Sequence, residues 1–321
     1  MKTALICGAG GQDGAYLAQL LLARGYLVVG TSRDAQSGRH QNLASLGIDG
    51  KVHIESMALN DFRSVLQVLA KIRPHEIYNL AGQSSVGLSF DQPVETLESI
   101  SNGTLNLLEG IRFLDPSIRL YSAGSSECFG NTGDIPADES TAFRPLSPYA
   151  VAKACAANLV ANYRAAYQLF ACTGFLFNHE SPLRPRRFVT RKIVEAAYKI
   201  HAGLESHVTL GNLDVSRDWG WAPDYVEAMW LLLQRESPLD VVIATGRTVS
   251  LKYFVQCAFT HFDLDWEQHV LLDKALLRPS DIACSSANVS LAAAELGWTA
   301  HHSVDDVVHN MCEAERARWE K

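Results

Sequence analysis

Two serines, a carboxylate, a tyrosine and a lysine near the middle of the chain have the types and spacing of a proton-transfer site. Ser125, Ser126 and Glu127 follow an apolar run. Tyr149 precedes Lys153 by four residues, so on a helix the two side chains share one face and reach the same ligand. A neighbouring ammonium favours the phenolate and lowers the pKa of a tyrosine toward the working range of a general base. Tyr149 and Lys153 alone are also compatible with an ordinary surface helix. The residues around them must decide between a catalytic pair and a surface pair.

A strand, a turn and a helix must position these residues. The apolar residues 118–123 predict a strand, and Gly124 lets the chain turn at its end. Ser147 and Pro148 mark a helix start, as the N-cap and the first helical residue. The helix over 149–168 then carries the tyrosine and the lysine.

A second strand, turn and helix unit opens the chain. Residues 3–7 are apolar, a glycine-rich turn follows them, and helical spacing of apolar residues comes next. Glycines let backbone N–H groups approach a pyrophosphate, and the helix N-terminus adds the positive end of its dipole. This context predicts a dinucleotide site. Its turn contains Gly8, Gly11, Gln12, Asp13 and Gly14.

The residues after the strand Tyr26–Gly30 bear on the cofactor. They include Arg33 and no acid at the tip of the strand. An acid there binds the ribose 2′-hydroxyl of NAD, whereas an arginine suits a 2′-phosphate. We therefore expect NADP. The alternative is that Arg33 is a solvated loop charge, and the adjacent Asp34 weakens the preference for NADP.

Strand and helix patterns alternate through the first half. Strands are predicted at Val52–Glu55, Glu76–Leu80 and Leu120–Ala123, and helices at 61–72 and 94–113. Such alternation predicts an α/β fold with a doubly wound parallel sheet of the Rossmann type.

The second half is more mixed, and we expect a smaller, mixed α/β substrate domain there. Residues 1–172 are the predicted NADP-binding domain and residues 173–321 the substrate domain, with residues about 213–245 returning to the first. Each cation of the second half is by default a solvated surface charge, but together they suit a diphosphate, because arginine forks match phosphate oxygens. These cations are Arg184, Arg186, Arg187, Arg191, Lys192, Arg217 and Arg278.

Composition excludes several classes of protein. The chain has 321 residues, 47% hydrophobic and 20% charged, which indicates an ordinary soluble globular protein. A net charge of −7 disfavours a nucleic-acid partner. Seven cysteines without a C-x-x-C pair predict reduced thiols in a cytoplasmic protein. We expect no signal peptide and no membrane span. We also expect no metal site, because no second histidine or cysteine lies at ligand spacing from His179.

Motifs along nearly the whole chain resemble one family. With them the sequence resembles the extended short-chain dehydrogenase/reductase family, and within it the GDP-mannose 4,6-dehydratases. The motifs are Gly8–Leu17, Asn79–Ser84, Ser125–Glu127, Ser147–Lys153, Phe177–Pro182, Phe188–Lys192, Leu210–Asp214 and Arg217–Gly220.

The resemblance implies an NADP-dependent 4,6-dehydration of a GDP-linked sugar, GDP-mannose or a close analogue, to its 4-keto-6-deoxy derivative. Tyr149 would take the proton of the 4-hydroxyl, Ser125 would hydrogen-bond that oxygen, and Lys153 would hold the cofactor ribose. Glu127 would remove the C5 proton, which the 4-ketone makes acidic.

The family pattern also implies the site residues. The catalytic ones are Ser125, Ser126, Glu127, Tyr149 and Lys153. Those for NADP are Gly8, Gly11, Gln12, Asp13, Gly14, Arg33, Leu59, Leu80, Ala81, Tyr149, Lys153, His179 and Arg184. Those for the GDP-sugar are Ser84, Ser85, Glu127, Asn178, Lys192, Gly211, Asn212, Arg217, Arg278 and Asp281. The loop through Arg39 resembles a cofactor-phosphate loop that in relatives reaches a neighbouring subunit.

The sequence departs from the family at five places. Ser125 stands for a threonine, and Gly124 for a serine, which predicts a looser loop. Asp34 stands for an arginine, and Ala58 for the acid that meets adenine. Residues 183–187 replace an Arg-Arg-Gly-Glu segment, so we expect a different sugar or cofactor edge of the site.

Alternatives within the same fold are a 4-keto-sugar reductase, an epimerase or a non-catalytic NADP-binding protein. Glu127 favours the dehydratase, because a reductase has no use for a base at C5. We also expect a homodimer or homotetramer that packs through helices 94–113 and 149–168.

Overall fold

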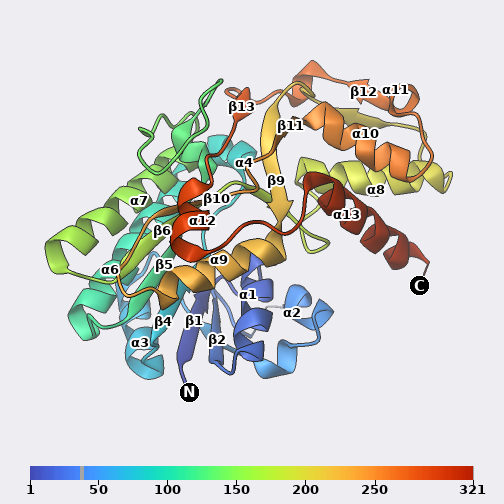
Figure 1. Cartoon of the computed structure of the whole chain (residues 1–321). Coiled ribbons are helices and arrows are strands. Elements are labelled where there is room, and N and C mark those ends of the chain that lie inside the picture. Colours follow the sequence, from blue (N-terminus) through green and yellow to red (C-terminus); the bar gives the residue numbers. More distant parts are fainter. Residues whose placement is uncertain (37–39, 321) are drawn as a thin grey trace.

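The computed structural model describes residues 1–36 and 40–320, and its centre is a seven-stranded parallel sheet (Figure 1). The strand order is β10-β6-β5-β4-β1-β2-β3. The predicted doubly wound α/β fold is confirmed. Arg39 of the expected cofactor-phosphate loop lies outside the described residues. The strands of this sheet are β1 (Thr3–Cys7), β2 (Leu27–Ser32), β3 (His53–Ser56), β4 (Glu76–Asn79), β5 (Arg119–Ala123), β6 (Ala171–Leu176) and β10 (Val241–Ile243).

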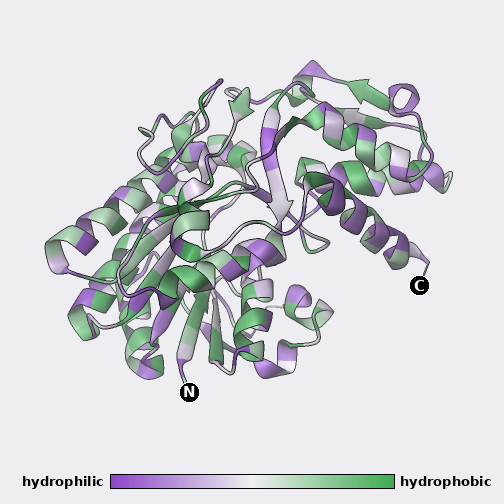
Figure 2. Ribbon diagram, viewed as in Figure 1, coloured by the Kyte–Doolittle hydropathy of each residue, from purple (hydrophilic) through white to green (hydrophobic). Residues whose placement is uncertain are grey.

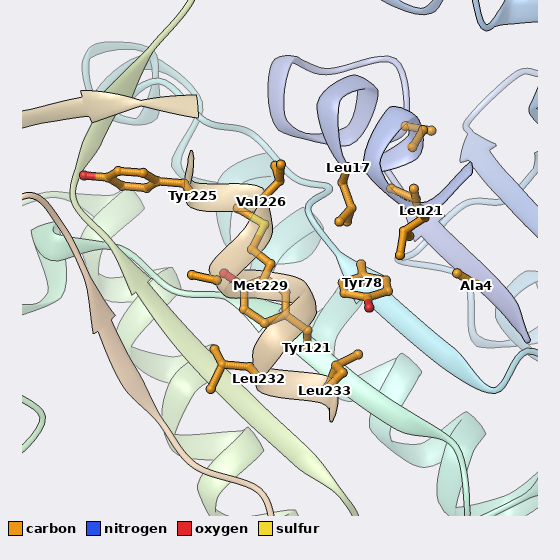
Figure 3. Packing of buried hydrophobic residues seen from close by; sticks show 14 of the residues in the cluster. Ala4, Leu17, Leu21, Tyr78, Tyr121, Tyr225, Val226, Met229, Leu232 and Leu233 are labelled. Atoms are coloured by element: carbon orange, nitrogen blue, oxygen red, sulfur yellow. The ribbon is translucent and has the colours of Figure 1, made fainter. Parts of the chain in front are cut away.

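Helices cover both faces of the sheet because successive strand residues point to opposite sides. On β1, Ala4 and Ile6 pack in one hydrophobic cluster, with α1 and α9, while Leu5 and Cys7 pack in another, with α3, α6 and α7. These helices are α1 (Gln12–Ala23), α3 (Phe62–Ile72), α6 (Gly103–Leu114), α7 (Pro148–Tyr167) and α9 (Ala222–Gln234). Figure 3 shows the first cluster, with side chains from α9, α1 and two strands: Val226, Met229, Leu232 and Leu233, Leu17 and Leu21, and Tyr78 and Tyr121.

The helix predicted over 94–113 is present, but it contains a π-helical turn that its sequence did not predict. A π-helical turn, Glu98–Asn102, separates α5 (Pro93–Leu97) from α6. Within this turn Ser101 donates a hydrogen bond to the Ala152 carbonyl of α7, at 3.1 Å. The sequence prediction missed the wide turn because its apolar spacing still fits a single helix. Two short helices, α2 (Gln41–Ser45) and α4 (Val86–Asp91), complete this part of the chain.

A smaller part of the protein lies beyond the carboxyl ends of the large sheet (Figure 1). Its strand β9 (Ser216–Trp221) pairs with β7 (Asn178–Glu180), β11 (Thr248–Ser250) and β13 (Cys284–Ser285), and β8 (Val208–Leu210) pairs with β12 (Val270–Leu272). Its helices are α8 (Val189–His201), α10 (Leu251–His261), α11 (Trp266–His269) and α13 (Val304–Trp319). Helices α8, α10 and α13 share one apolar core, and α13 is largely hydrophilic on the side seen in Figure 2.

The chain crosses between the two parts more than once. The expected boundary at residue 172 falls inside β6, which belongs to the large sheet over its whole length. Helix α9 packs on β5 and β6 of the large sheet, and β10 pairs with β6. Helix α12 (Ser290–Leu296) packs on both α9 and β10. The division into cofactor and substrate domains thus stays a proposal, with its boundary after β6. No helix among the described residues is long and apolar enough to span a membrane.

Candidate active site

The glycine-rich turn has a shape that only glycine allows. Gly8 has a φ of +84°, and a Cβ on Gly14 would overlap the Gly8 carbonyl and lie 2.7 Å from Cα of Ala9. Gly11 is the N-cap of α1 and places no side chain over the first N–H groups of the helix. Such a cradle of exposed amides at a helix N-terminus fits the pyrophosphate of a dinucleotide.

An ion pair joins this turn to the smaller part of the protein. Nε2 of His179 lies 2.9 Å from Oδ2 of Asp13, and Nδ1 lies 2.7 Å from the Phe177 carbonyl oxygen. Both neighbours are acceptors, and this arrangement favours the imidazolium form, in which both nitrogens donate. Burial opposes charge on both groups, but their mutual attraction lowers the pKa of Asp13 to about 2 and raises the pKa of His179. Gln12 also donates to the His179 carbonyl, at 3.2 Å.

The segment after β5 begins with a capped turn. Ser125 is the N-cap of a short 3₁₀ helix, Ser126–Phe129, and its Oγ accepts from the Glu127 amide at 3.3 Å. The predicted looser loop at Gly124 is wrong. A Cβ there would lie 2.7 Å from Cγ2 of Thr173, and the Gly124 amide donates to the Gly174 carbonyl at 2.8 Å. Close packing on β6 therefore explains the glycine.

Helix α7 starts where the sequence predicts. Ser147 is its N-cap, with Oγ accepting from the Ala150 amide at 3.1 Å, and Pro148 is its first residue. Nζ of Lys153 donates to the Ala123 carbonyl at 2.6 Å and lies 5.9 Å from the centroid of the Tyr149 ring. The end of β5 and the first turns of α7 thus hold the tyrosine and the lysine side by side.

Burial dominates the electrostatics of this end of the cleft. It lowers the pKa of Lys153 to about 8 and raises the pKa of Tyr149, although a hydrogen bond with Ser125 opposes the rise. The expected lowering of the Tyr149 pKa by Lys153 is not what this structure has. Burial also raises the pKa of Glu127, against the attraction of Arg217 and Arg278. A carboxylate with a raised pKa is a stronger base than an exposed one.

Most of the predicted site residues line one cleft of about 510 Å³. They come from the first turn of α1, from the ends of β4 and β5, from α7, and from β7, β9, α8 and loops of the smaller part. They are Asp13, Leu80, Ser84, Ser85, Ser125, Ser126, Glu127, Tyr149, Lys153, Asn178, His179, Arg184, Lys192, Gly211, Asn212, Arg217, Arg278 and Asp281.

The other predicted residues lie elsewhere. Gly8, Gly11, Gln12 and Gly14 form the turn next to the cleft, and the backbone of Ala81 lies against Gly8. Leu59 sits in the packing between its loop and α6, beside Gly103. Arg33 does not line the cleft. Its side chain is 87% exposed and faces Glu95 at 3.5 Å.

The structure adds lining residues that the sequence reasoning did not assign to the site. Arg187 was seen only as one member of the basic cluster, and Leu276 and Leu277 had no motif, although they directly precede Arg278. Within residues 1–36 and 40–320 no cluster of histidine, cysteine or acidic side chains is arranged to hold a metal ion.

The cations at the far end of the cleft are held by ion pairs and by backbone. Asp281 accepts from Nη2 of Arg217 at 3.1 Å and faces Nη1 of Arg278 at 3.5 Å. Nζ of Lys192 donates to the Thr209 carbonyl at 2.7 Å. Two arginines share the one carboxylate of Asp281, and Lys192 has only a carbonyl partner, so these side chains carry net positive charge, which suits a diphosphate.

Comparisons with known proteins agree with this geometry. The family model described as GDP-mannose 4,6 dehydratase matches residues 5–311. The chain is 42% identical to GDP-mannose 4,6 dehydratase 1 of Arabidopsis thaliana, covering 100% of this chain and 92% of that protein. It is 40% identical to the GDP-mannose 4,6 dehydratase of Homo sapiens, covering 98% and 91%.

Solved structures share the fold at lower identity. A dTDP-glucose 4,6-dehydratase from Bacillus anthracis in complex with NAD has a TM-score of 0.86 and 18% identity, over 100% of this chain and 98% of its own. RMD from Pseudomonas aeruginosa, complexed with NADPH, has a TM-score of 0.81 and 19% identity, over 99% and 100%. The sequence matches carry the assignment further than these structures do, and by them this chain belongs to the GDP-mannose 4,6-dehydratase family.

Proposed function

We propose that this protein is a nucleotide-sugar 4,6-dehydratase that converts GDP-mannose, or a close analogue, to its 4-keto-6-deoxy derivative with loss of water. One observation carries the proposal: a partly buried glutamate, Glu127, lies in the same cleft as Ser125, Tyr149 and Lys153. The last three serve any oxidation at a hydroxyl carbon, whereas a second base is needed only for elimination.

A nicotinamide cofactor fits the residues present. The turn Gly8–Gly14 would hold the pyrophosphate, and Lys153, His179 and Arg184 line the cleft toward the catalytic residues. When bound, the nicotinamide would take a hydride from C4 of the sugar and return it at C6. We propose NADP, on the ground that the tip of β2 carries Arg33 and no acid.

The residues at the ends of β5 and α7 would handle the first proton. Tyr149 would accept it from the 4-hydroxyl, and Ser125 would orient that oxygen through its own hydroxyl. The ammonium of Lys153, fixed on the Ala123 carbonyl, would stabilise the phenolate as it forms. Ser125 and Lys153 are buried and Tyr149 is partly buried, which limits the access of water to the reacting carbon.

Glu127 would handle the second proton. A ketone at C4 acidifies the neighbouring C5–H, so a carboxylate of raised pKa is able to remove it. The 6-hydroxyl would then leave as water with the proton held by Glu127. As the hydride returns at C6, C5 would regain a proton drawn from solvent through Glu127. The cations Lys192, Arg217 and Arg278 would meanwhile hold the diphosphate.

We further propose a cytoplasmic homodimer or homotetramer. Large apolar side chains are exposed on α5, α6 and α7, among them Val94, Phe113, Val151 and Tyr167, at 45 to 75%. Burying them across a two-fold axis would stabilise an assembly. Light scattering at micromolar concentration would return a multiple of the chain mass, and a monomer mass would contradict this.

The direct test is incubation with GDP-mannose and a panel of other nucleotide sugars, with NADP or NAD, followed by mass detection of water loss. We expect loss of water from GDP-mannose or a closely related GDP-sugar, with no net change in cofactor redox state. Net oxidation of the reduced cofactor would indicate a reductase, an isomer of unchanged mass would indicate an epimerase, and no turnover would favour a cofactor-binding protein.

A further inference from the structure

Most arginines on the walls of the cleft are paired with carboxylates. Among the described residues Lys153 and Lys192 have only backbone carbonyls as partners, and Arg187 has neither kind of partner. Glu180 faces Arg184 at 3.1 Å, and Asp281 faces two arginines of the nucleotide end. Among the described residues no carboxylate lies within ion-pair distance of Arg187, although its guanidinium lines the cleft. An uncompensated cation on the wall of a substrate cleft is available to bind an oxygen of the substrate.

Arg187 lies near the catalytic end of the cleft. Its Nη2 donates to Oγ of Ser84 at 3.3 Å, across the cleft from the loop in which it stands. Ser84 follows β4, which pairs with β5, and the carboxyl ends of neighbouring parallel strands meet at one edge of a sheet. Ser125 follows β5 at that same edge.

The guanidinium of Arg187 is also oriented. It lies 5.0 Å from the centroid of the Phe188 ring, so Ser84 and Phe188 hold it from two sides. A fork of several N–H donors, fixed in one plane, matches two adjacent oxygens better than a single one.

We propose that Arg187 is a specificity-determining residue that donates hydrogen bonds to hydroxyl oxygens of the sugar. This inference rests on the proposed function, because it needs a nucleotide sugar in the cleft. The diphosphate has its own cations at the other end, where Lys192 is tied to the Thr209 carbonyl and Arg217 to Asp281. Arg187 therefore contributes to binding of the sugar and not to binding of the nucleotide.

The neighbouring Arg186 provides a matched control. It stands in the same loop and is exposed, but it faces Glu195 at 3.0 Å and does not line the cleft. Replacing either arginine removes one positive charge from the same loop, so a difference between the two variants reports position and not net charge.

The experiment is calorimetric titration of the full chain and of its Arg187→Ala, Arg187→Lys and Arg186→Ala variants with GDP, GDP-mannose and NADP. For Arg187→Ala we expect the ratio of the GDP-mannose to the GDP dissociation constant to rise about 10-fold. Arg187→Lys, which keeps the charge but loses the fork, should fall between that variant and the unaltered protein. Arg186→Ala should stay within about twofold, and NADP binding should not change in any variant.

Three results would overturn the inference. An equal loss of GDP and GDP-mannose binding would place Arg187 on the diphosphate, and a loss of NADP binding would place it on the cofactor. An unchanged ratio of the GDP-mannose to the GDP dissociation constant would show that Arg187 does not contact the sugar. Failure of the proposed function looks different, since GDP-mannose would then bind without releasing water. Melting curves of the four proteins verify that each is folded, and Arg187 is exposed, so its replacement should not lower the melting temperature.

Discussion

The two ends of the cleft hold their functional side chains in different ways. At the catalytic end Ser125 and Lys153 are buried and held by helix caps and backbone carbonyls at the ends of β5 and α7. At the nucleotide end Lys192 and Arg278 stand on or beside loops of the smaller part, more exposed, and Arg278 is held by an ion pair with Asp281.

The difference separates rate from affinity. Burial shifts pKa values, so the catalytic end can set the proton affinity of Tyr149, Lys153 and Glu127. The cations of the nucleotide end bind phosphate oxygens. Two of them, the buried Arg217 and the exposed Arg278, also oppose the rise in the pKa of Glu127. Changes at the catalytic end should therefore lower kcat, and changes at the nucleotide end should raise KM.

The largest effect should come from Glu127→Gln. The amide keeps the shape of the side chain but cannot accept the C5 proton, so dehydration should fall on the order of 100- to 10,000-fold. Oxidation at C4 does not use this residue, so bound reduced cofactor should build up slowly and be visible by absorbance. Binding of NADP and GDP-mannose should remain near normal. Turnover close to that of the unaltered enzyme would contradict the assignment of Glu127.

A change of pH should alter kcat/KM through the catalytic end and leave GDP binding at the nucleotide end unchanged. Lys153 has a pKa lowered to about 8, so its charge is lost as the pH rises through that value, and kcat/KM should fall by up to about tenfold per pH unit above it. Glu127 has a raised pKa, so the acid limb should begin above the ordinary pKa of an exposed glutamate, as the base gains its proton. The check is a pH profile of kcat/KM beside the GDP dissociation constant. A GDP dissociation constant that changes with pH along the same bell-shaped curve as kcat/KM would contradict the difference between the two ends of the cleft.

At the nucleotide end, Arg278→Ala should raise KM for GDP-mannose about 10-fold while kcat changes much less. The side chain is 39% exposed and its ion pair with Asp281 spans 3.5 Å, so little stability depends on it. Steady-state kinetics at two salt concentrations provide the test, because screening should narrow the difference between the variant and the unaltered enzyme. A fall in kcat with an unchanged KM would contradict the proposed role.

The smallest effect should come from Arg33→Ala. Its guanidinium is largely exposed and faces Glu95 at 3.5 Å. Its removal should lower the preference for NADP over NAD only a few-fold, on the order of the 1 kcal/mol of an exposed charged contact. Dissociation constants for both cofactors are the measurement. A loss of NADP binding by orders of magnitude would show that Arg33 turns inward when the cofactor binds.

Sequence reasoning worked where the physics is local. The N-cap at Ser147, the glycines at 8, 11 and 14, and the alternation of strands and helices follow from spacing and backbone freedom within a few residues.

The same reasoning failed where distant segments meet. The direction of Arg33, the tight packing of Gly124 on β6 and the π-helical turn before α6 all depend on neighbours that are remote in sequence. The raised pKa of Tyr149 does not follow from its neighbours in sequence either, because burial by the surrounding fold outweighs the hydrogen bond with Ser125. Arg187 was visible as a charge but not as part of the cleft, since Ser84 lies on the other side.

The measurement that tests the central claim most directly is turnover of GDP-mannose in heavy water, with the product analysed by mass spectrometry and proton NMR. If Glu127 removes the C5 proton, the product has lost water and carries deuterium at C5, because the carboxyl group exchanges its proton with solvent. The hydrogen that arrives at C6 comes from C4 and should stay undeuterated. A dehydrated product without deuterium at C5, or one formed equally well by Glu127→Gln, would contradict this account of the catalytic end.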